Sequence, residues 1–186
     1  QPYLIPYLAE NSYCAVIVVP GGGFGYKSMD GSTGEGKDIA LTLQKEGINE
    51  FVLHYRSNPY EYPIPYLDLQ RTIRYLKYHG DKYGIDPNKI SLIGFSAGGN
   101  VIGTYINTIQ GRDFLTEGYQ RDEIDEMDDS VTSAAMIYPA LSFRYNVPML
   151  FCLFDDEDVR DTKKREELLE LTDLWRHISS QDVKQY

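Results

Sequence analysis

The chain has 186 residues, of which 42% are hydrophobic and 25% charged, so it is long enough to form one soluble domain with a buried core. Its net charge of −10 argues against nucleic acid or an anionic membrane surface as a partner, because both would repel it. No apolar run is long enough to span a bilayer, and the N-terminus lacks the pattern of a signal peptide. These features favour a cytoplasmic setting, although a secreted protein without its signal peptide would share them.

Runs of apolar and β-branched residues predict the strands of one sheet. Four runs are interpreted as strands: residues 13–19, 50–55, 89–95 and 131–138, of which the first two are expected to be buried. Helices are predicted between them: residues 32–46, 66–83 and 101–108. Residues 1–12 are expected to be irregular, because Pro6 excludes a central strand, and the prolines of 56–65 predict a surface loop. Strands that alternate with helices in this way predict an α/β fold with a parallel sheet and right-handed crossovers.

Three further features of the composition bear on the surface and the core. Residues 111–130 are strongly acidic and lack periodicity, so we interpret them as a solvated insertion and not as a binding segment. Cys14 and Cys152 each lie in an apolar run and are expected to be buried free thiols. The 16 tyrosines are an excess that suits a surface packing against sugars or other amphipathic ligands.

The most informative stretch is residues 90–100, where an apolar run ends in the pattern G-x-S-x-G around Ser96. Gly94 and Gly98 stand two residues before and after the serine, where bulky side chains would clash in a sharp turn from strand to helix. Such a turn exposes the serine hydroxyl above the edge of the sheet. It also points the Ala97 N–H towards a developing oxyanion. Ser96 is therefore the candidate nucleophile.

Three consecutive glycines, Gly21, Gly22 and Gly23, directly follow the first predicted buried strand. In an esterase such a loop supplies the other half of the oxyanion hole, because glycine lets backbone N–H groups approach the substrate. A phosphate-binding loop is the alternative. The dinucleotide pattern fails at its last glycine, and the Walker A pattern, attempted over 31–38, ends in Asp38 where a hydroxyl should bind magnesium. We therefore expect no nucleotide, no metal and no cofactor.

Four motifs in a fixed order resemble the α/β-hydrolase esterases. They are Val19-Pro20-Gly21-Gly22-Gly23-Phe24, Asp68-Leu69-Gln70-Arg71, Gly84-Ile85-Asp86-Pro87 and Gly94-Phe95-Ser96-Ala97-Gly98-Gly99. The chain is most similar to the branch of acetyl-xylan-esterase and hormone-sensitive-lipase-like carboxylesterases, over about residues 16–138. The resemblance implies a three-layer sandwich with a mostly parallel sheet. It also implies Ser96 as nucleophile, with an oxyanion hole formed by the N–H groups of Gly22, Gly23 and Ala97. One departure is Pro20, where many relatives have histidine, which leaves the anchoring of the loop open.

The histidine of a catalytic triad is hard to find in this chain. The fold places it after the serine and the acid, and His177 is the only histidine after Ser96. His177 ends a run with helical spacing, so we interpret it as a helix C-terminal residue stabilised by the helix dipole. His54, in a predicted strand, and His79, near the end of a predicted helix, are interpreted as structural.

The triad acid is equally hard to place. The apolar run 147–154 resembles a strand that carries the acid at its end, since it is followed by Asp155, Asp156 and Asp158. We prefer to interpret this region as part of the cap segment that precedes the acid strand in the family. We therefore expect the acid and the histidine to lie beyond Tyr186, with a further strand following that residue closely, and the sheet to be incomplete at its C-terminal end.

The sequence thus predicts a single, partial α/β-hydrolase domain over residues 1–186, with an acidic insertion at about 111–130 and a cap-like segment at about 143–182. The expected function is a serine carboxylesterase for short acyl esters, with acetylated carbohydrates among the candidate substrates. Two alternatives stay open: a serine peptidase of the same fold, and a non-catalytic binding protein that has lost the triad. Neither the acyl specificity nor the oligomeric state follows from the sequence.

Overall fold

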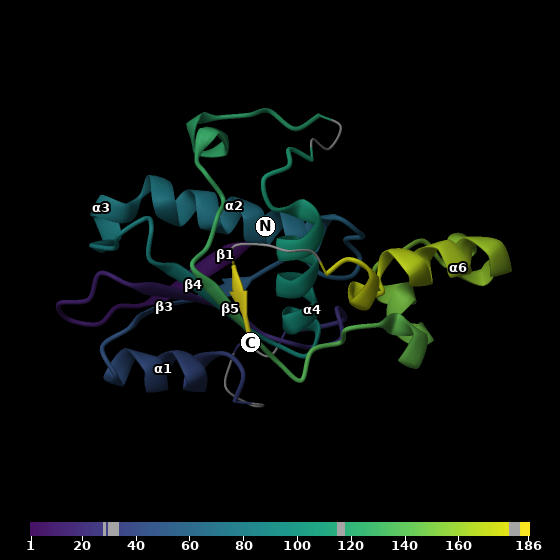
Figure 1. The fold of residues 1–186 in the computed structure, drawn as a ribbon, viewed down its shortest axis with the longest axis horizontal. Helices are drawn as coiled ribbons and strands as arrows, with labels where there is room; N and C mark the ends of the chain where they lie inside the picture. Colours follow the sequence, from purple (N-terminus) through teal and green to yellow (C-terminus); the bar gives the residue numbers. More distant parts are fainter. Residues whose placement is uncertain (28, 30–33, 115–117, 179–182) are drawn as a thin grey trace.

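The computed structural model describes residues 1–27, 29, 34–114, 118–178 and 183–186. Their centre is a sheet with the strand order β1-β3-β2-β4-β5-β6 (Figure 1). The strands are β1 (Tyr3–Tyr7), β2 (Ala15–Val19), β3 (Asn49–His54), β4 (Ile90–Phe95), β5 (Ser133–Ile137) and β6 (Lys184–Gln185). All neighbouring strands are parallel except β1 and β3, which are antiparallel. The four predicted strands are confirmed, with ends shifted by one or two residues.

The helices cover both faces of the sheet, as a three-layer sandwich requires (Figure 1). They are α1 (Lys37–Lys45), α2 (Ile64–Tyr78), α3 (Gly80–Tyr83), α4 (Ala97–Thr104), α5 (Asp156–Arg160) and α6 (Thr162–Leu171). Two hydrophobic clusters reflect the alternation of side chains along β2. Ile17 belongs to the cluster that contains Leu69 of α2 and Val101 of α4, whereas Val18 belongs to the cluster that contains Ala40 of α1.

Two strands were not predicted, and both lie at edges of the sheet. β1 contains Pro6, which has no N–H to donate, and an edge strand tolerates it because only one side is paired. The expectation of an irregular N-terminal segment is therefore wrong for Tyr3–Tyr7. β6 pairs in parallel with β5. The expectation that the next strand begins after Tyr186 is also wrong, since this strand begins at Lys184.

The predicted helices are confirmed with altered ends, except that the predicted helix 66–83 is divided into α2 and α3 at His79. α1 begins at Lys37; the predicted start at residue 32 lies outside the described residues. Gly47, at a φ of 82°, lies just after α1, at a backbone angle that favours glycine. α2 begins at Ile64, inside the predicted loop 56–65, because proline is tolerated in the first helical turn. The third helix starts directly after Ser96 and ends in a π-helical turn, Tyr105–Ile109.

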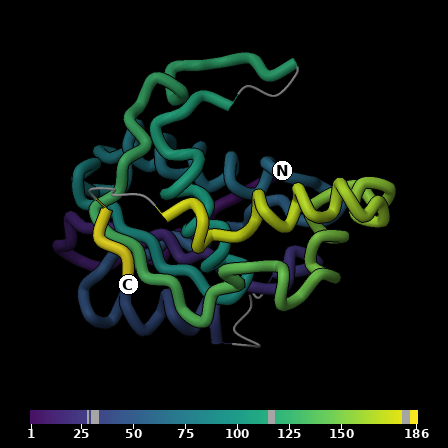
Figure 2. The backbone as a smooth tube through the Cα atoms, turned by 45° about the vertical axis from the view of Figure 1, so that its right-hand side comes forward, coloured from purple at the N-terminus to yellow at the C-terminus, as the bar shows by residue number. Residues whose placement is uncertain are grey.

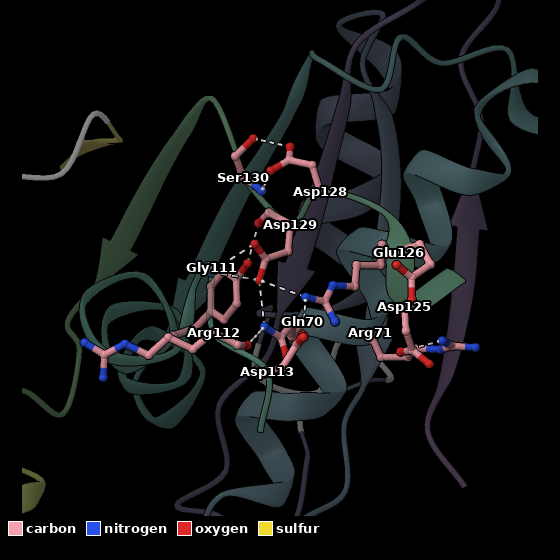
Figure 3. A network of polar contacts seen from close by, with 12 residues as sticks. Gln70, Arg71, Gly111, Arg112, Asp113, Asp125, Glu126, Asp128, Asp129 and Ser130 are labelled. Carbon is pink, nitrogen blue, oxygen red and sulfur yellow. Dashed lines mark hydrogen bonds and ion pairs between the residues drawn. The ribbon is translucent and has the colours of Figure 1, made fainter. Parts of the chain in front are cut away.

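The acidic stretch 111–130, of which 115–117 are not described, packs against α2 through polar contacts (Figure 3). It includes a short 3₁₀ helix, Glu123–Glu126. The carboxylate of Asp129 is buried and accepts hydrogen bonds from the Gln70 side chain (2.7 Å) and the Gly111 N–H (3.0 Å). Asp125 is also buried, and its carboxylate oxygen Oδ1 lies 2.8 Å from the guanidinium nitrogen Nη1 of Arg71. Most of the described residues of this stretch are exposed, as expected, but Asp125 and Asp129 are not, because α2 supplies partners for these two carboxylates.

The segment between β5 and β6 leaves the sheet and returns to it (Figure 2). Besides α5 and α6 it contains three short 3₁₀ helices: Phe143–Tyr145, Val147–Cys152 and Leu174–Arg176. This is the segment interpreted as cap-like; its last residues, 179–182, lie outside the described part of the chain. α6 projects from the sheet beyond α4 (Figures 1 and 2). No helix in the described ranges is both long and apolar enough to cross a membrane.

Glu50 of β3 is a buried carboxyl group with an unusual environment. Its side chain is 0% exposed, and neither of its oxygens has a hydrogen-bond partner within the described structure. Burial, and secondarily the neighbouring Cys14, raises the pKa of Glu50 to about 9 from its ordinary value of 4.5. Between these two values the folded protein keeps a proton that the unfolded chain releases. The contribution of the protonated Glu50 to the free energy of unfolding is thus complete below pH 4.5 and is lost as the pH rises towards 9.

We expect Glu50→Gln to raise the free energy of unfolding at neutral pH by about 3 kcal/mol, since the amide resembles the protonated carboxyl and carries no charge. The substitution should also remove a slope of about 1.4 kcal/mol per pH unit from the stability curve above pH 4.5. Urea denaturation across this range measures both. The exposed residue Glu10, changed to glutamine, is the control and should leave the slope in place. Equal slopes for Glu50→Gln and the unmodified protein would contradict the assignment.

Candidate active site

Ser96 lies at the turn between β4 and α4 and has a strained backbone, with φ of 50° and ψ of −114°. A non-glycine residue at positive φ is held there only when its surroundings fix it, and such strain is typical of the nucleophile turn of hydrolases. Three backbone hydrogen bonds fix it here. The Ser96 N–H donates to Ile137 O (3.0 Å), and its carbonyl accepts from the N–H groups of Asn100 (3.1 Å) and Ala140 (3.2 Å).

The glycines around Ser96 are required by close backbone contacts. A Cβ atom on Gly94 would lie 2.6 Å from the carbonyl oxygen of Gly98, and a Cβ on Gly98 would lie 2.0 Å from that of Val19. Gly99 is similarly restricted, since a Cβ there would lie 2.8 Å from the Pro139 side chain. The sequence argument that bulky residues would clash in this turn is confirmed, and it extends to Gly99.

The glycine loop after β2 lies against the Ser96 turn. A Cβ on Gly21 would be 3.0 Å from the Cβ of Ser96 and 2.9 Å from the carbonyl oxygen of Phe95. Gly22 and Gly23 have φ values of 133° and 59°, which favour glycine. The loop closes on itself, because the Gly22 carbonyl accepts from the N–H groups of Gly25 (3.0 Å) and Tyr26 (3.2 Å).

Three N–H groups around Ser96 have no hydrogen-bond acceptor among the described residues: those of Gly22, Gly23 and Ala97. Ala97 is 0% exposed, and a buried backbone N–H is almost always paired in folded proteins. An unpaired N–H at the start of α4 is free to donate to a ligand atom. These three residues are the ones that the resemblance implies for the oxyanion hole.

The loop is anchored by aromatic side chains that the sequence did not reveal. The Tyr55 hydroxyl donates to the carbonyl oxygen of Pro20 at 2.9 Å, and burial raises the pKa of this phenol well above its usual value. Phe24 is fully buried, with its ring 6.5 Å from Tyr55 and 6.1 Å from Phe143. The loop is therefore supported although position 20 is a proline.

Asn100 fixes the other side of the turn. Its amide donates to the carbonyl oxygen of Ala140 at 2.7 Å, and its side-chain oxygen accepts from the Tyr66 hydroxyl at 3.1 Å. These bonds tie the first turn of α4 both to α2 and to the segment that follows β5. The sequence motif contains Asn100, but its partners are 34 and 40 residues away and could not be identified from the motif.

None of the three histidines contacts Ser96. His54 stacks on Tyr3 across β1 and β3, with the ring centroids 4.3 Å apart. His79 lies at the junction of α2 and α3. His177 follows the 3₁₀ helix Leu174–Arg176, and its Nε2 lies 3.1 Å from the carbonyl oxygen of Glu170. His177 is a C-terminal cap, as expected, but of this short helix alone, because α6 already ends at Leu171.

The three candidate aspartates belong to a helix start. Asp155 caps α5 by accepting a hydrogen bond from the Glu157 N–H at 2.8 Å, and Asp156 and Asp158 lie in the first turn. The preceding residues form the 3₁₀ helix Val147–Cys152 and not a strand. The alternative of an acid at the end of a strand is therefore wrong for these three residues, and the cap-like role of the region stays a prediction.

Two cavities and two thiols lie outside this site. The larger cavity, about 580 Å³, and the smaller, about 310 Å³, are lined by residues of α2 that include Asp68 and Arg71, and Ser96 lines neither. Cys14 and Cys152 are free and half-buried, so the prediction of free thiols is confirmed and that of full burial is not.

Comparisons with known proteins agree with this architecture. A sequence model of the BD-FAE family matches residues 3–135. An acetylxylan esterase from Xylanibacter ruminicola is 36% identical over 99 residues, which cover 53% of this chain and 20% of that protein. The structure of an acetyl ester-xyloside bifunctional hydrolase from Caldicellulosiruptor lactoaceticus has a TM-score of 0.80 at 28% identity and covers 99% of this chain and 64% of that one.

A second solved structure supports the fold alone. A thermophilic esterase from Thermogutta terrifontis has a TM-score of 0.71 at 19% identity and covers 100% of this chain and 65% of that one. The chain thus spans less than two thirds of either solved structure and about one fifth of the curated relative. The three-layer sandwich is the α/β-hydrolase fold, as the resemblance implied. Since the family model spans well over half of its residues, the chain belongs to the BD-FAE family.

Proposed function

We propose that this chain carries the nucleophile and the oxyanion hole of a serine carboxylesterase that hydrolyses short-chain acyl esters, including acetylated carbohydrates. The observation that carries the proposal is the strained Ser96, which lies against the glycine loop and next to the buried N–H of Ala97, for which the described residues offer no acceptor. A serine held in this conformation presents its hydroxyl to a substrate, while the neighbouring donors face the site of developing charge.

The reaction follows from these groups. The Ser96 hydroxyl gives its proton to a base while its oxygen attacks the ester carbonyl. The carbonyl oxygen becomes an oxyanion, which accepts hydrogen bonds from the N–H groups of Gly22, Gly23 and Ala97. Collapse of the tetrahedral intermediate expels the alcohol, which takes up the proton, and leaves the acyl group on Ser96. Water then attacks the acyl-enzyme by the same route and releases the acid.

The base is proposed to lie outside the described residues. A serine without an imidazole is a weak nucleophile, and none of the three histidines contacts Ser96. The fold places the acid and then the histidine after the serine in the chain. We propose that both follow Tyr186. The parallel pairing of β6 beside β5 supports this, because it extends the sheet in the direction where the acid-bearing strand is expected.

The substrate class is proposed from the relatives together with the site. The matching proteins include an acetylxylan esterase and an acetyl ester-xyloside bifunctional hydrolase, both named for acetyl esters. The chain also matches an endo-1,4-beta-xylanase B from Butyrivibrio fibrisolvens over 109 residues at 32% identity. An acetyl group on a xylan-type sugar is therefore the substrate to test first.

A fluorophosphonate probe separates the esterase from a non-catalytic binding protein, since only an activated serine is labelled. In the complete enzyme, with the acid and the histidine present, we expect labelling of Ser96. Ser96→Ala should abolish labelling. Ser91→Ala should leave labelling unchanged, because the Ser91 hydroxyl, on β4, is bonded to that of Ser133 at 3.0 Å. In the 186-residue chain, His177→Ala should leave the slow labelling unchanged; a marked fall would make His177 the base.

A further inference from the structure

The carboxylate of Glu35 joins two segments that flank Ser96. Its Oε2 accepts a hydrogen bond from the Gly21 N–H at 2.9 Å, at the start of the glycine loop. Its Oε1 accepts from the Tyr138 hydroxyl at 2.8 Å, at the end of β5. Glu35 and Tyr138 are 103 residues apart in the chain, so this is a long-range tertiary contact.

The carboxylate lies beside the nucleophile. A Cβ atom added to Gly21 would lie 2.8 Å from Oε2 of Glu35 and 3.0 Å from the Cβ of Ser96. The Glu35 carboxylate and the Ser96 side chain are therefore both close to Gly21. Tyr138 follows Ile137, whose carbonyl oxygen accepts from the Ser96 N–H at 3.0 Å. The two ends of the Glu35 bridge are therefore the loop and the strand between which the serine turn is held.

Tyr138 is itself held in an unusual conformation. Its φ of 39° lies in the left-handed region, which bulky residues rarely adopt without support. The side chain is 62% exposed, yet its ring lies 6.0 Å from that of Phe95 and its hydroxyl is bonded to Glu35. Partial burial, and then this hydrogen bond, raises the pKa of Tyr138. Although the Tyr138 side chain faces solvent, its contacts with Phe95 and Glu35 therefore fix its position.

We propose that Glu35 is a positioning residue of the active site, and that together with Tyr138 it latches the oxyanion-hole loop against the Ser96 turn. The latch occupies the N–H of Gly21 and so fixes the peptide that precedes the donors of Gly22 and Gly23. This inference rests on the proposed function, because it names what positions the loop of that same site.

Two substitutions separate the geometry of the latch from its charge. In Glu35→Gln the amide oxygen can still accept from Gly21, and the amide NH₂ can donate to the Tyr138 oxygen, since a phenol is both donor and acceptor. Glu35→Ala removes both contacts. A displacement of the donors by about 1 Å is enough to cost about 10²-fold in rate.

In the complete enzyme we expect Glu35→Ala to lower kcat for p-nitrophenyl acetate by about 10²-fold with little change in KM, and Glu35→Gln to restore most of the loss. Tyr138→Phe should lower kcat by about tenfold, as it removes one hydrogen bond to a charged group. The control is Tyr145→Phe, whose side chain is 91% exposed, and it should keep wild-type kcat. Wild-type kcat in a folded Glu35→Ala enzyme would overturn the latch. If Glu35→Ala does not fold, Tyr138→Phe decides in its place.

A spectroscopic measurement on the 186-residue chain tests the latch without any turnover. The amide proton resonance of Gly21 should move upfield in Glu35→Ala and also shift in Tyr138→Phe, because both variants alter the carboxylate that accepts from it. Tyr145→Phe should leave it in place. An unchanged Gly21 resonance in both latch variants would overturn the proposal. If Ser96→Ala were to keep full turnover, the esterase proposal would fail, and this spectrum would still decide the latch.

Discussion

Ser96→Ala is expected to lower kcat of the complete enzyme for p-nitrophenyl acetate by about 10⁴- to 10⁶-fold, because it removes the atom that forms the acyl-enzyme. The residual rate would come from substrate binding and the oxyanion hole, which the substitution leaves in place. The fold should survive, since the conformation of residue 96 is set by backbone hydrogen bonds to Ile137, Asn100 and Ala140 and not by the hydroxyl. Steady-state kinetics and circular dichroism measure the two parts of this result.

Ser91→Ala is the matched control for this experiment. Ser91 lies on β4, the strand that leads into the Ser96 turn, and its hydroxyl bonds to that of Ser133 on the neighbouring strand at 3.0 Å. Its loss should alter stability slightly and leave kcat unchanged. A Ser96→Ala enzyme that turned over at the rate of Ser91→Ala would remove Ser96 from the mechanism.

Gly98→Ala is expected to destabilise the protein by about 3 kcal/mol or more, at the upper end for overpacking. The new Cβ would lie 2.0 Å from the carbonyl oxygen of Val19 and 2.7 Å from that of Pro20. These are backbone atoms, which cannot rotate away as a side chain can, so β2 and α4 would have to move apart. The melting temperature should fall by about 10 °C, as measured by circular dichroism.

Gly25→Ala is the control, because its Cβ would meet only the carbonyl oxygen of Gly22, at 3.9 Å. This substitution should leave the melting temperature within about 2 °C of the wild-type value. If Gly98→Ala melted together with Gly25→Ala, the close packing of α4 on the end of β2 would be wrong.

The parts of the fold that the sequence predicted are those encoded locally. The four central strands are short, mostly apolar runs that end at turn residues, and the turn at Ser96 needs glycines two positions away on each side. Both signals lie within a few neighbouring residues. This is why the central parallel strands and the turn at Ser96 were predicted with small errors at their ends, whereas the predicted helix 66–83 extended five residues beyond α2.

The parts that were missed depend on partners far away in the chain. β1 became a strand because it pairs with β3, which overrides the unfavourable Pro6. β6 has only two residues, too few for any periodicity. Asp129 of the acidic stretch is buried because Gln70 of α2 satisfies it, and charge alone predicted the opposite. Composition describes such segments, but it does not identify their partners.

The same reason explains what was missed at the site. Glu35 was not among the residues that the sequence singled out, since nothing near it in the chain indicates its contacts with Gly21 and Tyr138. The support of Pro20 by Tyr55 was hidden in the same way. The residues proposed to have chemical roles were predicted from the sequence, whereas those proposed to position them emerged only from the tertiary structure.

The central claim is that Ser96 forms the acyl-enzyme, and peptide mapping after rapid quenching tests it most directly. The complete enzyme is mixed with p-nitrophenyl acetate, quenched in acid during turnover, digested and analysed by mass spectrometry. We predict one added acetyl group on the peptide that contains Ser96, and no acetylated peptide from Ser96→Ala. An acetyl group on another residue, with the Ser96 peptide unmodified while product forms, would contradict the account.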